Sequence, residues 1–83
     1  MITDKMIYYF NKIMQENHES PIKLVRNKEI EGVVNITIED KFIEYLGIEL
    51  SDEFYDILNN FFSAQGIKLS FNNTGLTIWA TID

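Results

Sequence analysis

Hydrophobic residues near the start of the chain recur every three to four positions, a spacing that predicts an amphipathic helix over residues 3 to about 17. Its apolar stripe consists of Met6, Ile7, Phe10, Ile13 and Met14. Thr3 is placed to cap this helix, and Asn11 falls on the opposite, polar face. Pro21 ends the helix, because proline lacks an N–H group and biases the residue before it toward extended backbone.

Alternating apolar and polar residues then predict a first β-hairpin, with strands over 22–26 and 30–39 and Gly32 as a bulge. The face of the second strand that is expected to point inward carries Ile30, Val34, Ile36 and Ile38. The opposite face is mixed, since Val33 alternates there with polar residues.

A second hairpin is predicted over 67–71 and 76–82, joined by a turn at 72–75 that is rich in Asn and Gly. The inward side chains are expected to be Ile67, Leu69, Phe71, Leu76, Ile78, Ala80 and Ile82. Thr77, Trp79 and Thr81 then lie on the other side of the sheet, because side chains alternate along a strand.

Between the hairpins, Ser51 caps a second amphipathic helix that runs to about Gln65, with Gly66 after its end. The apolar stripe of this helix consists of Phe54, Ile57, Leu58, Phe61, Phe62 and Ala64. The segment 40–47 is ambiguous. It is either a short helix between Asp40 and Gly47, which we favour, or a third strand paired with the second.

This order, α-β-β-(α)-α-β-β, predicts a single α+β domain over residues 1–83. In this prediction, two β-hairpins form a four-stranded antiparallel sheet. Two main helices pack on one face of it, together with a possible short helix over 40–47. The other sheet face is left open. The side chains expected on that open face are Val25, Val33, Thr77, Trp79 and Thr81.

The amino-acid composition excludes several kinds of site. Its 83 residues include no Cys and one His, which excludes a disulfide framework and the common Cys- and His-rich zinc sites. The first residues lack the pattern of a secretion signal and no apolar run approaches the roughly 20 residues of a membrane span, so a cytoplasmic location is expected.

The net charge of −6 comes from the middle of the chain. Residues 39–56 hold seven carboxylates against Lys41, whereas the six acids and six bases elsewhere balance. A single Arg and no basic stripe argue against direct binding to nucleic acid or to an anionic membrane. The expected partner is a protein with a basic surface, although the acids could also serve only to keep the protein in solution.

No catalytic signature is present, and no enzyme activity, catalytic residue, cofactor or metal is predicted. His18 lies at the end of the first helix between two Glu residues, where a cation suits the helix terminus. The glycines are isolated and form no phosphate-binding loop. The pairs Asp52/Asp56 and Glu49/Glu53 have the spacing to hold Mg²⁺ or Ca²⁺ weakly, but no loop brings in further ligands.

The leading hypothesis is a protein-binding surface built on the acidic middle of the chain. Its residues are Asp40, Glu44, Tyr45, Glu49, Asp52, Glu53, Tyr55, Asp56, Asn59 and Asn60. A line of acceptors along a helix can occupy Lys and Arg that otherwise hold phosphates, which is the physical basis of DNA mimicry. In size, acidity and an Ile-, Asn- and Lys-rich coding bias, the chain is similar to phage inhibitors such as anti-CRISPR proteins and to bacterial immunity proteins.

The alternative is a homodimer or an accessory subunit without an inhibitory role, joined through the open sheet face around Trp79. Tryptophan is favoured at binding surfaces, and an exposed one usually has a cover.

Overall fold

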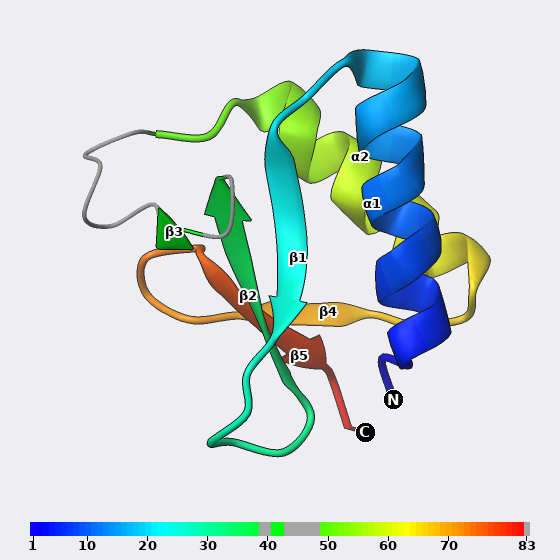
Figure 1. Cartoon of the computed structure of the whole chain (residues 1–83). Coiled ribbons are helices and arrows are strands. Elements are labelled where there is room, and N and C mark those ends of the chain that lie inside the picture. The colour runs from blue at the N-terminus through cyan, green and yellow to red at the C-terminus, as the bar shows by residue number, and fades with distance from the viewer. Residues whose placement is uncertain (39–40, 43–48, 83) are drawn as a thin grey trace.

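The structure is a computed structural model and describes residues 1–38, 41–42 and 49–82. This part of the chain forms two helices and five strands, with three strands after the first helix and two after the second (Figure 1). They are α1 (Asp4–His18), β1 (Ile22–Arg26), β2 (Val33–Ile38), β3 (Lys41–Phe42), α2 (Asp52–Ala64), β4 (Leu69–Phe71) and β5 (Thr77–Ala80).

The strands form one antiparallel sheet in the order β1-β2-β5-β4. Both predicted hairpins are confirmed, as β1–β2 and β4–β5. They join in the middle of the sheet, where Val34 of β2 lies opposite Ile78 of β5. Further along the same edge of β2, the two-residue β3 pairs with Thr37 and Ile38.

Both helices begin where their capping residues predict. The Thr3 Oγ1 atom accepts a hydrogen bond from the Met6 N–H group, and the Ser51 Oγ atom accepts one from the Phe54 N–H group, each at 3.2 Å. These bonds satisfy N–H groups that have no partner within the helix. The first helix ends at His18, and Glu19 follows in the left-handed region at φ 49°.

A single hydrophobic core lies between the helices and one face of the sheet, as predicted. The helices contribute Ile7, Phe10, Met14, Phe54, Leu58 and Phe62, and the sheet contributes Leu24, Val34, Ile36, Leu69 and Ile78. The Phe10 ring joins the two helices, with centroid distances of 6.1 Å to Phe54 and 6.2 Å to Phe62. Each fully buried side chain of this size contributes about 1.5–3 kcal/mol to folding.

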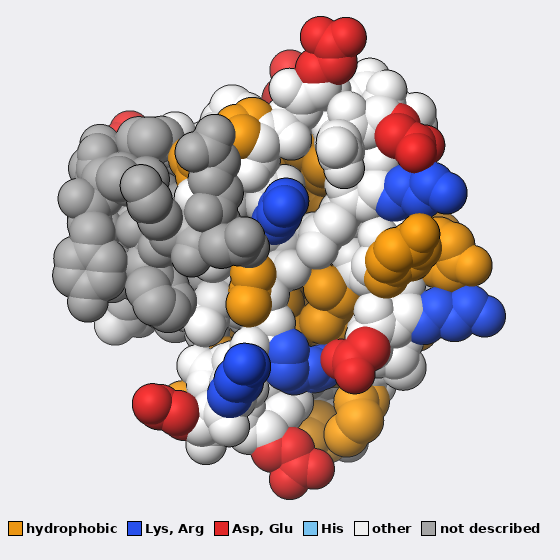
Figure 2. Space-filling model, in the orientation of Figure 1, with side chains coloured by type: hydrophobic (Ala, Val, Ile, Leu, Met, Phe, Trp, Pro, Cys, Tyr) orange, Lys and Arg blue, Asp and Glu red, His pale blue; other side chains and the backbone are white. Residues whose placement is uncertain are grey.

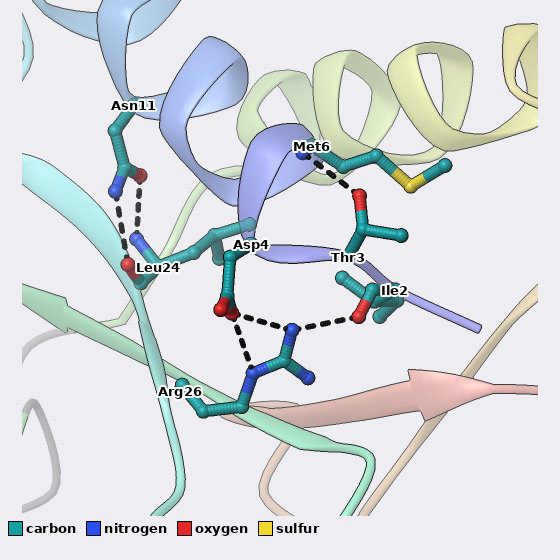
Figure 3. A network of polar contacts seen from close by, with 7 residues as sticks. All are labelled: Ile2, Thr3, Asp4, Met6, Asn11, Leu24 and Arg26. Atoms are coloured by element: carbon teal, nitrogen blue, oxygen red, sulfur yellow. Dashed lines mark hydrogen bonds and ion pairs between the residues drawn. The ribbon is translucent and has the colours of Figure 1, made fainter.

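Polar contacts attach α1 along the outer edge of β1 (Figure 3). The Asn11 side chain accepts a hydrogen bond from the Leu24 N–H group at 2.7 Å and donates one to the Leu24 carbonyl at 2.9 Å. Arg26 donates to the Asp4 carboxylate and to the Ile2 carbonyl. Asn11 is therefore not on a free polar face of the helix: it is half-buried and bonds to the sheet.

Several predicted strand ends are wrong. β4 begins at Leu69 and not at residue 67, and β5 begins at Thr77 and not at residue 76. β2 begins at Val33 and not at residue 30, because Asn27 accepts hydrogen bonds from the N–H groups of Glu29 and Ile30 and holds them in a turn. Ile30 is consequently 57% exposed. β5 ends at Ala80, which leaves Ile82 93% exposed and not inward.

The predicted short helix over 40–47 is wrong at Lys41 and Phe42, which are extended and pair with Ile38 and Thr37. Backbone hydrogen bonding to β2 holds these two residues in the sheet, as in the alternative interpretation of this segment. Residues 40 and 43–47 of that prediction lie outside the described residues. Ala64 also differs from its predicted place in the apolar stripe, since it is exposed at the last turn of α2.

Candidate functional site

The outer face of α2 carries the described part of the predicted acidic surface. Asp52, Glu53 and Asp56 are exposed on the first two turns, and Asn59 and Asn60 are exposed on the next. Asp52 and Glu53 are favourable at the start of the helix because the N–H groups there carry partial positive charge. Burial of the opposite stripe against the sheet turns these polar side chains to solvent.

The carboxylates of this face are not neutralised by neighbouring cations in the described part of the chain. The one ion pair found there joins Arg26 to Asp4 at 2.9 Å, far along the sequence from α2. Glu49, which precedes the helix, is also exposed. Four carboxylates, those of Glu49, Asp52, Glu53 and Asp56, therefore have no cationic partner among the described residues.

The side of the molecule formed by α1 and β1 has a different charge pattern. Figure 2 shows Lys and Arg side chains interspersed with Asp and Glu on this side. This agrees with the balance of six acids and six bases outside residues 39–56. The excess of negative charge is therefore concentrated elsewhere, with its described members at and before the start of α2.

Three residues of the predicted acidic surface, Asp40, Glu44 and Tyr45, lie outside the described residues. Tyr55 is described and is half-buried. Its hydroxyl donates a hydrogen bond to the Gly75 carbonyl at 2.8 Å, and its ring packs edge-on against Phe71. Burial raises the pKa of the Tyr55 hydroxyl. Tyr55 thus has a place inside the fold, and its contact with a partner stays a prediction.

The residues of the alternative predicted interface lie on the sheet face that the helices do not cover. Register places Val33 opposite Trp79, and Thr77 and Val25 on either side of Asn35. Thr81 joins them through a hydroxyl contact with Ser70. All five predicted residues, Val25, Val33, Thr77, Trp79 and Thr81, are half-buried.

An open groove of about 470 Å³ lies at one end of this face, beside Trp79. Met1, Gly32, Val33 and Ile82 also line it. Met1 and Ile82 are 78% and 93% exposed, and no pattern in the sequence predicts that they lie together. Their proximity arises because the two ends of the chain lie close to each other in the fold (Figure 1).

A second groove, of about 550 Å³, was also not predicted. It lies between α2 and the start of β4 and is lined by Asn59, Asn60, Ser63, Gly66, Ile67, Lys68 and Leu69. Two of the predicted partner-binding residues, Asn59 and Asn60, therefore border a concave surface and not only a convex helix face.

The described residues offer no arrangement suited to metal chemistry, since no group of three or more His, Asp or Glu side chains among them converges on a point. His18 is exposed at the end of α1.

None of the described helices has the length and apolar character needed to cross a membrane. Comparison with models of protein families, with curated proteins and with solved structures found no match to the chain.

Proposed function

We propose that this chain is a non-enzymatic binding protein that acts in the cytoplasm and masks a basic surface of a protein partner. The observation that carries the proposal is the set of exposed carboxylates of Glu49, Asp52, Glu53 and Asp56, none of which has a cationic neighbour in the described part of the chain. Unpaired charges gathered on one face raise the rate of association with a surface of opposite charge.

A nucleic-acid-handling protein is the partner that this chemistry fits best. Such proteins hold phosphates with Lys and Arg, and an α-helix repeats its face about every 6 Å over four residues. Asp52 and Asp56 have that spacing, and Asn59, Asn60 and Ser63 extend the line of polar groups. The chain would then act as an inhibitor that takes the place of nucleic acid, a role in keeping with its similarity in character to phage inhibitors such as anti-CRISPR proteins.

The experiment is capture of the partner from an extract of the organism that encodes the chain, followed by measurement of its affinity and of its nucleic-acid binding. A triple variant, Asp52→Lys, Glu53→Lys and Asp56→Lys, should lose capture. The matched control, Glu16→Lys, Glu19→Lys and Glu29→Lys, reverses three exposed carboxylates elsewhere. Both variants change the net charge from −6 to 0, so they differ only in where the charge is reversed.

The proposal requires that the wild type and the control displace nucleic acid from the partner and that the α2 variant does not. Capture should also weaken between 0.1 M and 1 M salt, where the Debye length falls from about 10 Å to about 3 Å. Equal binding by both triple variants, or no captured partner, would contradict it. Circular dichroism of each variant checks that the fold is retained.

The groove beside Trp79 favours a second candidate function, a homodimer or accessory subunit joined through the open sheet face. Met1, Val33, Trp79 and Ile82 form an apolar surface at that groove, and a two-fold contact would bury it. Sedimentation equilibrium at tens of micromolar tests this candidate. A monomer whose single Trp is freely quenched by iodide would eliminate the homodimer.

A further inference from the structure

In the described part of the chain, β1 and β4 are the outermost strands of the β1-β2-β5-β4 order, and their edges differ in how the backbone is satisfied. An edge strand turns the N–H and C=O groups of every second residue away from the sheet, and these groups can pair with another chain. Natural proteins usually protect such edges. The state of each edge therefore indicates where an additional strand can bind.

Side chains occupy the edge of β1 at Ile22 and Leu24. Asn11 occupies both backbone groups of Leu24 (Figure 3). The Ser20 Oγ atom accepts a hydrogen bond from the Ile22 N–H group at 3.2 Å. The Asn11 amide offers one donor and one acceptor to Leu24, as a neighbouring strand would. A strand from another chain cannot pair there without displacing α1.

The edge of β4 is open in the described part of the chain. Lys68 and Asn72 use their backbone toward β5, through bonds of 2.8 Å from the Thr81 N–H group and 3.0 Å to the Thr77 carbonyl. Ser70 lies between them, opposite Trp79. Leu69 and Phe71 alternate with these residues, so their N–H and C=O groups point outward. No described residue bonds to them.

The groove of about 550 Å³ borders the start of this open edge, at Leu69. Ser63 and Asn60 of α2 form one wall, and Ile67, Lys68 and Leu69 form the other. An extended chain that pairs with Leu69 and Phe71 would place alternate side chains toward this wall of amide and hydroxyl groups. Strand addition obtains affinity from the backbone bonds and specificity from such alternate side-chain contacts.

The acidic side chains of α2 favour a basic segment at this edge over a second copy of the chain. α2 runs back along β4, since the Ile67 N–H group donates to the Phe62 carbonyl at one end and the Tyr55 ring packs on Phe71 at the other. Asp52, Glu53 and Asp56 therefore lie toward the Phe71 end, and α2 contains no Lys or Arg. A second copy of the chain would bring the same three acids and a net charge of −6, whereas a basic segment would meet them with opposite charge.

We propose that the open edge of β4 and the outer face of α2 together bind an extended, basic peptide segment of the partner by strand addition. This inference rests on the proposed function and adds the conformation of the segment that is bound. Basic side chains of the segment lie toward the Phe71 end of the strand, near Asp52 and Asp56, and not beside Lys68.

The test uses the full chain and three capped peptides of about six residues, a common strand length. One alternates Val and Lys, one alternates Val and Glu, and one is the Val/Lys peptide with alternate residues N-methylated so that it cannot pair with an edge. Amide hydrogen exchange is followed by NMR. The Val/Lys peptide should slow exchange at Leu69 and Phe71 by about tenfold or more, with no comparable change at Ser70, whose backbone already faces β5.

The other two peptides should leave exchange at Leu69 and Phe71 unchanged. A matched variant of the chain carries an N-methyl group on the Phe71 nitrogen, made by joining a synthetic segment at the exposed Ala64. It keeps every side chain and the bonds to β5, and it should no longer bind the Val/Lys peptide. The control carries the N-methyl group on the exposed turn residue Asn73 and should bind as the unmodified chain does.

Three outcomes would overturn strand addition. Peptide binding with NMR shifts only at residues 52–56 would leave the proposed function intact and remove the edge from it. Absence of binding by every peptide would also reject the edge, while capture of a folded partner tests the proposed function separately. Exchange at Leu69 and Phe71 that depends on the concentration of the chain alone would assign the edge to a second copy.

Discussion

At the scale of single residues, the contact between Tyr55 and Gly75 connects α2 to the β4–β5 turn. Gly75 has φ +74°, and a Cβ atom there would lie 3.0 Å from the Tyr55 hydroxyl oxygen. The hydroxyl also donates a hydrogen bond to the Gly75 carbonyl. Glycine is required at this position both for its backbone conformation and for the space that Tyr55 occupies.

Gly75→Ala is expected to destabilise the protein more than Gly32→Ala. Gly32 has a similar φ of +81°, but a Cβ atom there would meet nothing within 4 Å, so its substitution measures only the left-handed backbone, about 1–2 kcal/mol. The additional loss at Gly75 measures the contact with Tyr55. Free energies of unfolding in urea provide the measurement. The excess should shrink in a Tyr55→Phe background, and equal losses at both glycines would contradict the assignment.

Burial that raises the pKa of Tyr55 makes stability depend on pH in the alkaline range. The unfolded chain loses this proton first, near the ordinary value of 10.0. The stabilisation is therefore complete below pH 10 and is lost as the pH rises through the higher value of the folded state. Urea midpoints of the wild type should fall more steeply above pH 10 than those of Tyr55→Phe. Parallel curves would show that Tyr55 does not contribute.

At the scale of elements, the sequence predicted what local contacts decide. Thr3 and Ser51 mark the helix starts because a cap bonds within its own first turn. The hairpin of β4 and β5 was predictable from its turn, where the Asn72 carbonyl accepts from the Gly75 N–H group. The pairing of β2 with β5 was not, since it joins residues far apart in the sequence and no local pattern specifies it.

The contacts of Asn11 were also not predictable from local sequence. Helical periodicity places Asn11 among polar residues, and only the packing of α1 on β1 brings it to the N–H and C=O groups of Leu24. Asn11→Ala would leave the N–H and C=O groups of Leu24 without them, a loss of about 1–3 kcal/mol. Lys12→Ala, at an exposed neighbouring position, should change stability little. Urea unfolding compares the two variants, and faster amide exchange at Leu24 should accompany the loss. A stability for Asn11→Ala as close to the wild type as that of Lys12→Ala would show that solvent replaces the side chain.

At the scale of the whole molecule, the acidic face was predictable and the groove beside it was not. The exposed positions of α2 are the complement of its apolar stripe, so Asp52, Asp56 and Asn60 could be placed on one face from periodicity alone. The groove exists because β4 is an edge strand next to α2. Strand order decides this, and two hairpins can be joined in more than one order without any change in their local patterns.

Two isoleucines have a burial that the alternation of apolar and polar residues does not predict, and they allow a direct comparison. Ile30 continues the alternation of β2 but lies in a turn and is 57% exposed, whereas Ile2, which precedes the first helix, is 1% exposed within the core. Arg26 donates to the Ile2 carbonyl and holds this segment in place. Ile2→Ala should therefore cost about 2–5 kcal/mol, and Ile30→Ala should cost well under 1 kcal/mol. Chemical denaturation of the two variants tests this order, and a larger loss at Ile30 would mean that the alternating pattern, and not the turn at Asn27, determines where β2 begins.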